Sequence, residues 1–186
     1  GRADVGDGNG GRRAYAVSPF VHCLRTARPD PATAPQRTSM GPRYRELLED
    51  IFTRKVLASD FSLYLHRPTA TDPSLTPPGG DAFYVLSPVP HLGGDTDWSM
   101  AARPYRDAIV QYLEAHHLPD LSKHIVTERI VDPRYFRDTL NSSLGSAFSV
   151  EPVRTQSAWM RPPNRSGAIS NPELHGAGTQ SRKGPR

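Results

Sequence analysis

The stretch Phe83-Tyr84-Val85-Leu86-Ser87-Pro88-Val89-Pro90 carries the strongest strand signal in this chain. Its first four residues are all apolar or aromatic, which is typical of a strand buried in a sheet. Proline has no backbone N–H to donate to a neighbouring strand. We therefore expect a strand over 83–86 whose hydrogen-bond ladder ends at Pro88 and Pro90.

Two amphipathic helices are predicted on either side of this strand. Apolar residues recur at helical spacing in the stretches 44–52 and 103–117, and Pro42 suits the first turn of the earlier helix. The apolar positions are Tyr44, Leu47, Leu48, Ile51 and Phe52 in the first stretch, and Tyr105, Ile109, Tyr112 and Leu113 in the second.

Further strands are predicted over 61–65 and 125–131, where apolar and polar residues alternate. Asp132-Pro133 is a suitable cap and first-turn pair for a short helix after the second of these strands. Helices and strands are thus interspersed. The predicted fold class is α/β, with the character of an α+β fragment built on a mixed sheet with helices.

Composition limits the classes of protein that need considering. The chain has 186 residues, of which 36% are hydrophobic, with 19 Pro and 15 Gly. It contains no run of about 18 apolar residues and its start lacks an apolar signal region, so we expect neither a transmembrane helix nor a signal peptide. A single cysteine is compatible with a reducing compartment, and we expect a cytoplasmic protein.

The positive charge lies at the two ends of the chain. The formal net charge is +4, yet the central part, 46–160, holds more Asp and Glu than Lys and Arg. Nucleic-acid binding would require a basic face on a folded element, so we expect no nucleic-acid partner. The adjacent His116 and His117 point in different directions on a helix, and we expect no metal site.

Residues 1–40 are predicted to be a disordered arm. Gly6, Gly8, Gly10 and Gly11 precede an Arg pair, and residues 25–40 are rich in Arg, Pro and Ala without an apolar period. The chain lacks a dinucleotide-binding fingerprint, because no strand precedes Gly6 to Gly11 and no apolar helix follows.

Arg67 and Asp72 are the candidate catalytic residues of the stretch Leu65-His66-Arg67-Pro68-Thr69-Ala70-Thr71-Asp72-Pro73. Arg67 follows a predicted strand, where a guanidinium could bind an anionic group or a cofactor. It could equally form an ion pair, with Asp72 as a suitable partner, that locks the proline-rich loop from Pro68 to Gly80. On the residues alone we favour the ion pair.

The strings 65–73, 84–93 and Gly145-Ser146-Ala147-Phe148-Ser149-Val150-Glu151-Pro152 together resemble the substrate domain of bacterial-type phytoene desaturases. The resemblance covers about residues 41–179. It implies a two-domain flavoprotein of the amine-oxidase type, in which FAD removes hydrogen from phytoene and extends its conjugation towards lycopene. It also implies a lipophilic polyene substrate, phytoene, and peripheral contact with a membrane surface.

The same resemblance implies a flavin contact at Gly176, Ala177, Gly178 and Thr179, where the family chain returns to the FAD domain. We therefore expect residues 41–160 to form the substrate-domain portion and 161–186 to begin the returning segment. Residues before about Met40 depart from the family pattern, and our hypothesis is that they come from a translated wrong reading frame or a pseudogene junction. Taken alone, the chain is not expected to hold FAD.

Two alternatives stay open from the sequence. The protein could be a related carotenoid or polyene oxidoreductase, with a different substrate and the same chemistry. It could also be a catalytically dead fragment or pseudogene product that keeps the domain without flavin. Its oligomeric state and its catalytic base are not predicted.

Overall fold

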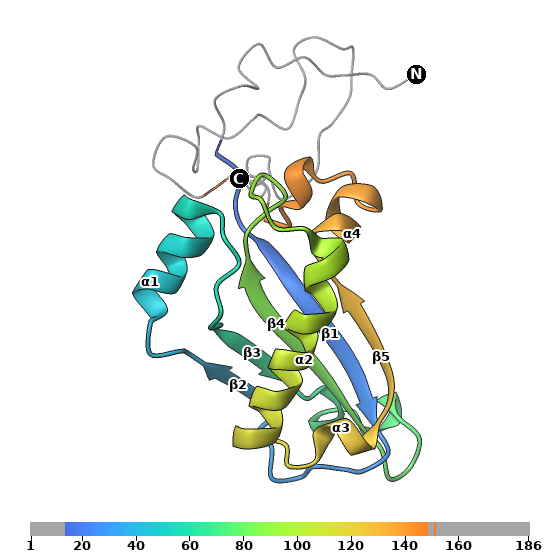
Figure 1. The fold of residues 1–186 in the computed structure, drawn as a ribbon. Coiled ribbons are helices and arrows are strands. Elements are labelled where there is room, and N and C mark those ends of the chain that lie inside the picture. The colour runs from blue at the N-terminus through green and yellow to red at the C-terminus, as the bar shows by residue number, and fades with distance from the viewer. Residues whose placement is uncertain (1–13, 149–150, 152–186) are drawn as a thin grey trace, which may run out of the picture.

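The computed structural model describes residues 14–148 and residue 151. They form a five-stranded sheet in the order β2-β3-β4-β1-β5, with one long helix across one of its faces (Figure 1). All four strand pairings are antiparallel. The predicted combination of helices and strands is confirmed, whereas the predicted mixed sheet is wrong for the described residues.

Strand β4 (Asp81–Val89) is the predicted central strand, and it continues beyond the expected end. Pro88 does not end the ladder, because it lies directly opposite Pro19 of strand β1 (Ser18–Thr26). In an antiparallel pair, residues alternate between positions that exchange hydrogen bonds and positions that do not. Two facing prolines fit a position of the second kind, so neither strand loses a bond there.

The sequence predicted a disordered arm over residues 1–40. For most of residues 14–40, which the structure describes, this prediction is wrong. β1 lies inside the sheet between β4 and β5, and β2 (Gln36–Ser39) forms one edge by pairing with β3 (Leu63–His66). β1 is buried on both faces along its first half. A strand buried on both faces shows no apolar–polar alternation, which is why its sequence carried no period-2 signal.

Helix α2 (Trp98–His116) packs along the sheet and forms the main core with β1, β3 and β4. The sequence placed its start at Arg103, but the helix begins earlier because Asp97 caps it by accepting a hydrogen bond from the Ser99 N–H at 2.9 Å. The aromatic rings of Phe20 and Tyr105 meet edge to face at 5.0 Å in this core.

The other predicted elements are present with small shifts in their bounds. Helix α1 (Tyr44–Glu49) continues as a π-helical turn, Asp50–Arg54, and packs Leu47 and Ile51 against Val17 in a second, smaller core. Helix α3 (Leu121–His124) leads directly into strand β5 (Ile125–Val131). Helix α4 (Pro133–Asp138) is capped by Asp132 as predicted, through a 2.8 Å bond from the Arg134 N–H.

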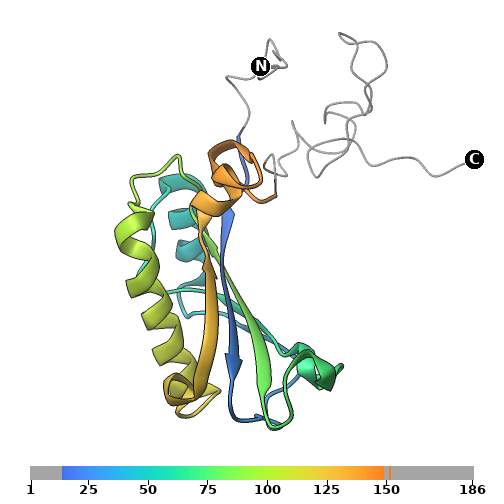
Figure 2. The same ribbon diagram turned by 90° about the vertical axis from the view of Figure 1, so that its right-hand side faces the viewer.

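The two faces of the sheet differ. Figure 2 shows α2 lying along one face, whereas no described helix of comparable length lies along the other. We call this second surface the open face. Its side chains are those that alternate with the core residues, and several are half-buried apolar or aromatic groups: Tyr64 on β3, Tyr84 and Leu86 on β4, and Cys23 on β1.

Candidate functional site

Two of the three family-like strings, 65–73 and the one that begins at Gly145, lie at opposite ends of the sheet. The string 65–73 covers the end of β3 and two 3-10 turns, Pro68–Ala70 and Pro73–Leu75, and it lies beside the start of β4. The string that begins at Gly145 lies beside the residues that follow β4 and the start of β1. The structure therefore does not unite them in one site.

Arg67 is held at its end of the sheet by Asp81 and Asp30. Its side chain is only 14% exposed, its Nε lies 3.9 Å from Oδ2 of Asp81, and its Nη1 donates to the backbone carbonyl of Asp30. Asp81 also accepts hydrogen bonds from the Asp30 N–H at 2.9 Å and from the Thr69 hydroxyl. We call Arg67, Asp81, Asp30 and Thr69 the arginine end. Arg67 thus forms the ion pair that we favoured, but its partner is Asp81.

Asp72 has a different role from the one predicted. It is exposed and caps the turn Pro73–Leu75, accepting hydrogen bonds from the N–H and the hydroxyl of Ser74 at 3.0 and 2.6 Å. These hydrogen bonds lower the pKa of the Asp72 carboxyl. The prediction that Asp72 pairs with Arg67 is therefore wrong. Asp72 is a local cap because the nearest donor groups belong to the turn that it begins.

The proline-rich loop encloses a cavity of about 220 Å³ beside the arginine end. Arg67, Thr69 and Asp81 line one side of it, and the residues around Pro77 and Gly79 line another. Because the polar groups of Asp81 already accept from backbone and side-chain donors, the cavity presents no free carboxylate. Its wall is built mainly of proline rings and turns.

The opposite end of the sheet is built by close backbone contacts around Gly145. Gly145 has a φ of 67°, and a Cβ there would lie 2.2 Å from the carbonyl oxygen of Pro133. The Gly145 carbonyl accepts a 2.6 Å hydrogen bond from the Ser18 hydroxyl, and the Leu144 carbonyl accepts one from the Leu92 N–H at 2.8 Å. We call Gly145, Pro133, Ser18 and Leu92 the glycine end.

A titratable group, His91, lies beside the glycine end, directly before Leu92 in the chain. Its side chain is buried, and Nδ1 accepts a hydrogen bond from the Gly93 N–H at 2.9 Å. Burial and the nearby charge of Lys55 lower the pKa of the His91 imidazole. The string 84–93 and the string that begins at Gly145 thus lie side by side here, joined by the backbone hydrogen bond between Leu92 and Leu144.

A polar cluster in which only His22 is fully buried joins β1, β5 and α2, and sequence reasoning missed it. His22 is fully buried, and its Nε2 lies 2.7 Å from a Glu128 carboxylate oxygen, which is also 2.6 Å from a guanidinium nitrogen of Arg106. Burial lowers the pKa of His22. Burial alone would raise the pKa of Glu128, but its hydrogen bonds with Arg106 and His22 lower it overall. No local sequence pattern could have found the cluster, because 106 residues separate His22 from Glu128.

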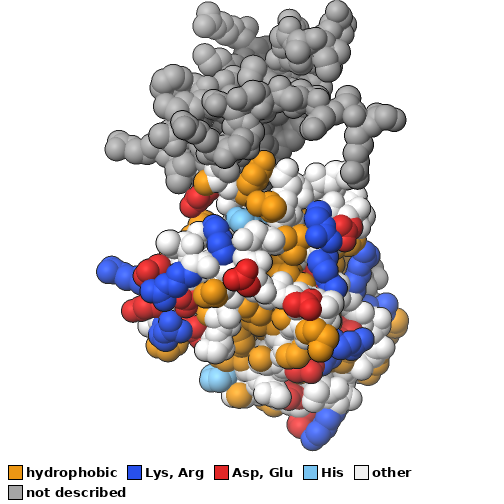
Figure 3. All heavy atoms as spheres, turned by 45° about the horizontal axis from the view of Figure 1, so that its top comes forward, with side chains coloured by type: hydrophobic (Ala, Val, Ile, Leu, Met, Phe, Trp, Pro, Cys, Tyr) orange, Lys and Arg blue, Asp and Glu red, His pale blue; other side chains and the backbone are white. Residues whose placement is uncertain are grey.

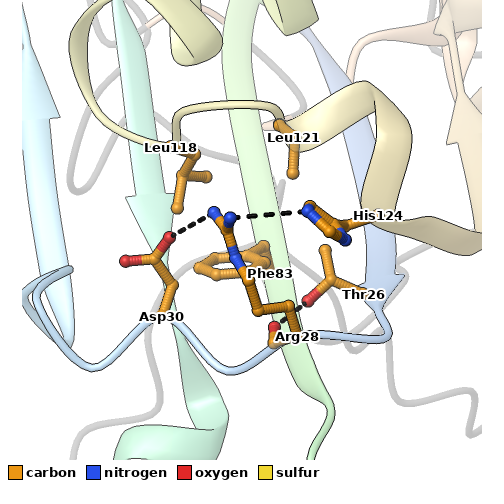
Figure 4. Close-up of a pocket in the computed structure, with 7 residues that line it drawn as sticks. All are labelled: Thr26, Arg28, Asp30, Phe83, Leu118, Leu121 and His124. Atoms are coloured by element: carbon orange, nitrogen blue, oxygen red, sulfur yellow. Dashed lines mark hydrogen bonds and ion pairs between the residues drawn. The ribbon is translucent and has the colours of Figure 1, made fainter.

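A groove of about 300 Å³ lies on the open face of the sheet. Cys23 and Tyr84 line its floor, Pro68 lines it from the proline-rich loop, and Arg25 and Arg129 also contribute to its wall. A much smaller cavity of about 10 Å³ lies between β1, α3 and the loop after β1, where Arg28 approaches His124 and Asp30 (Figure 4). That smaller cavity has room for about one water molecule.

Among the residues that the structure describes, no three His, Cys, Asp or Glu side chains converge as metal ligands, and no helix is long and apolar enough to cross a membrane. On the face that Figure 3 shows, acidic and basic side chains are intermixed around hydrophobic ones. The predicted flavin contact, Gly176, Ala177, Gly178 and Thr179, lies outside the described residues.

The chain is similar to several known enzymes of carotenoid synthesis, although no protein-family model matches it. It is 51% identical over 174 residues to a lycopene-forming phytoene desaturase of Pseudescherichia vulneris, covering 93% of this chain and 35% of that relative. It is 55% identical over 145 residues to a lycopene-forming phytoene desaturase of Pantoea ananas, with 77% and 30% covered. A neurosporene-forming phytoene desaturase of Rhodobacter capsulatus is 47% identical over 147 residues, with 78% and 28% covered.

These similarities make the chain a relative of the carotenoid desaturases. Within that class it is homologous to the bacterial phytoene desaturases, and the resemblance predicted from the sequence is confirmed. The chain spans about a third of the length of the curated relatives it matches.

The comparison also corrects the hypothesis of a wrong reading frame before Met40. A match over 174 of the 186 residues has to include residues 14–40. This stretch contains β1 and β2, which complete the sheet. The N-terminal residues of the described part therefore belong to the same fold as the rest.

Proposed function

We propose that this chain is the substrate-domain part of an FAD-dependent phytoene desaturase, which removes hydrogen from phytoene and extends its conjugation towards lycopene. The observation that carries the proposal is the 51% identity to the lycopene-forming enzyme over 93% of the chain. A related polyene oxidoreductase would retain the chemistry and differ in substrate.

The open face of the sheet is the proposed wall for the hydrocarbon. Tyr64 and Leu86 lie on this face and are only half-buried, so they offer apolar surface that the described residues leave partly uncovered. Burying such surface against a polyene is favourable at about 25 cal/mol per Å². These residues would bind and orient the substrate and exclude water from it.

FAD would supply the oxidising chemistry, by accepting the electrons that leave the substrate. The described residues do not form the glycine-rich turn between strand and helix that holds a dinucleotide. We propose that Gly176, Ala177, Gly178 and Thr179 contact the flavin, and that 161–186 begin the segment returning to the FAD domain. The rest of the cofactor site would come from the part of the protein that this chain does not span.

Arg67 and Asp72 remain candidate catalytic residues, but their contacts support structural roles. Arg67 pairs with Asp81, and Asp72 caps a turn. We propose that Arg67 holds the proline-rich loop in place at one end of the open face. The protein is further proposed to be cytoplasmic and in peripheral contact with a bilayer, since its proposed hydrocarbon substrate dissolves there.

A segment exchange tests the proposed function. The matching part of the Pseudescherichia vulneris enzyme is replaced by this chain, and the chimera is expressed in a host that accumulates phytoene. We expect coloured desaturation products, identified by their absorption spectra. A matched chimera carrying Gly145→Ala should give less folded enzyme and less product.

A well-expressed, flavin-loaded chimera that leaves phytoene unchanged would contradict the proposal and favour a catalytically dead fragment. The chain alone provides a second measurement. When it is purified and incubated with FAD, we expect no bound-flavin absorbance after gel filtration. Retained flavin would show that the chain holds a more complete cofactor site than we propose.

A further inference from the structure

The groove on the open face combines an apolar floor with two arginines. Arg25 and Arg129 bring two guanidinium groups, and the uncharged lining residues on this face are Cys23, Pro68, Ala82, Tyr84 and Thr127. Leu24 and Phe83 also border the groove, but their side chains belong to the core on the other side of the sheet. The groove is therefore amphipathic.

The strand register places the two arginines next to each other. Arg129 of β5 is opposite Cys23 of β1, and Arg25 of β1 is opposite Thr127 of β5. Residues that differ by two positions along one strand point to the same face, so Arg25 and Arg129 are diagonal neighbours. Such neighbours are about 7–8 Å apart, a separation that two long side chains can bridge around one anion.

Neither guanidinium is neutralised by a described carboxylate. Arg25 is half-buried, it forms no ion pair among the described residues, and its Nε is buried without a hydrogen-bond partner. Arg129 lies 5.3 Å from the ring centre of Tyr135, which is a cation–π contact and not an ion pair. The nearest acidic residue in the groove, Glu128, already binds Arg106 and His22 on the core side.

We propose that this groove binds an anionic phospholipid, with the phosphate between Arg25 and Arg129 and the start of an acyl chain over Tyr84 and Pro68. A hydrocarbon alone would leave both guanidinium groups without a counter-charge, and a free phosphate would leave the apolar floor in water. An amphiphile satisfies both parts of the groove. The inference deepens the proposed membrane contact and rests on it.

Cys23 provides a site-specific probe, because it is the only cysteine of the chain and it lines the groove. Burial raises the pKa of the Cys23 thiol, so its alkylation is followed at about pH 8.5. The rate is measured on the full chain with dihexanoyl phosphatidic acid, with dihexanoyl phosphatidylcholine and with inorganic phosphate. We expect phosphatidic acid to protect the thiol in a saturable manner, and the other two to protect it much less.

Removal of the two charges should weaken this protection. Each basic residue near an anionic lipid surface contributes about 1 kcal/mol, so R25Q/R129Q should bind phosphatidic acid about 30-fold more weakly. The charge-matched control R45Q/R103Q changes two exposed arginines elsewhere, on α1 and α2, and should bind like the wild type. The variant R25K/R129K keeps both charges and should retain most of the affinity, which separates loss of charge from loss of folding.

Three results would overturn the inference. Equal protection by the two phospholipids would mean that the groove does not select an amphiphile of net negative charge. Protection by phosphate alone would indicate an anion site without a lipid. Equal affinities of R25Q/R129Q and R45Q/R103Q would show that these arginines do not bind the headgroup.

Flotation with phosphatidylglycerol vesicles separates this inference from the proposal on which it rests. If the chain floats with the vesicles and R25Q/R129Q floats equally well, the membrane contact stands and the groove is not its site. If the wild type does not float, the proposed membrane contact fails as well. The desaturase function is tested independently, by the phytoene conversion of the chimera.

Discussion

At the glycine end of the sheet, backbone packs against backbone, whereas at the arginine end, charged side chains pack among turns. Gly145 touches Pro133 so closely that no Cβ would fit, and its neighbours are joined by short hydrogen bonds. Arg67 and Asp81 are instead surrounded by a loop rich in proline, with a cavity beside them. The arginine end carries one of the three family-like strings, and the glycine end carries residues of the other two.

This difference shows that sequence strings typical of one family can be held in place by different interactions: a close backbone contact at one end and an ion pair at the other. A backbone contact is sensitive to volume, because a protein interior has little room for an added carbon. A buried ion pair is sensitive to charge, because removing one partner leaves the other without compensation. Substitutions can therefore be chosen that damage one end and spare the other.

The largest effect is expected from Gly145→Ala. An alanine at φ 67° adopts the unfavourable left-handed conformation, and its Cβ would overlap the Pro133 carbonyl oxygen. Together, the strain and the overlap should lower the free energy of unfolding by about 4 kcal/mol. Urea denaturation followed by tryptophan fluorescence measures this loss.

Gly79→Ala is the matched control for this substitution. Gly79 lies in the proline-rich loop with a φ of 83°, but nothing lies within 4 Å of the position of a Cβ. It should therefore show the conformational cost alone, about 1 kcal/mol. Equal losses in the two variants would mean that the close contact at Gly145 is not a constraint, and the comparison between the two ends would fail.

The second largest effect is expected from Asp81→Ala at the arginine end. Asp81 is 3% exposed, and its loss removes the counter-charge of Arg67 and an acceptor for the Asp30 N–H. We expect the free energy of unfolding to fall by about 3 kcal/mol. The double variant Arg67→Met/Asp81→Ala should recover part of this loss, because it removes the uncompensated charge. No recovery in urea denaturation would show that the ion pair is not what Asp81 contributes.

A smaller effect is expected from pH at the glycine end. The folded pKa of His91 is lowered from its ordinary value of 6.5, so the unfolded chain binds the proton more readily. Stability should therefore be complete above about pH 6.5 and decline as the pH falls below it. His22 contributes in the same direction.

His91→Gln isolates the contribution of His91 to this pH dependence. The variant should lose less stability than the wild type between about pH 7.5 and about pH 5.5, since the side chain no longer titrates. His22→Gln should remove the part of the pH dependence of stability that comes from His22, in the middle of the sheet. Urea midpoints at the two pH values measure both. A wild type that becomes more stable on acidification would contradict the assigned direction.

The smallest effect is expected from Asp72→Ala. Asp72 is exposed and only caps a 3-10 turn, so the urea midpoint should shift far less than in Asp81→Ala. The two substitutions remove the same type of side chain from the same end of the sheet. A loss for Asp72→Ala as large as that for Asp81→Ala would reinstate Asp72 as the functional partner of Arg67.

The elements that the sequence predicted well are those whose signals are local. The helical spacing of Ile109 and Leu113 in α2, the alternation in β5 and the cap at Asp132 all arise from residues a few positions apart. Strand β1 was missed because Phe20, Val21 and Leu24 do not alternate with polar residues, and because Pro19 argues against a strand. Only its pairing with β4 and β5 stabilises it as a strand.

The candidate site likewise combines features that local sequence predicts with contacts that only the folded chain makes. The sequence indicated that Arg67 locks its loop through an ion pair. The suitable partner in the sequence, Asp72, is the acidic residue nearest to it along the chain. The actual partner, Asp81, comes from the start of β4 and reaches Arg67 when the loop between them folds back. The arginines of the groove could not be paired from the sequence, because one of them lies in β1.

The sequence by itself determined the family of this chain, most of its helices and strands, and the three strings that mark it as a desaturase relative. Only the tertiary structure decided where those strings lie, which charges are paired, and that residues before Met40 complete the sheet. The physical reason is that helical spacing and caps are encoded over a few residues, whereas strand pairing and ion pairs depend on partners far apart in the chain. Cys23 and Arg129 face each other only because β1 and β5 pair across more than a hundred residues.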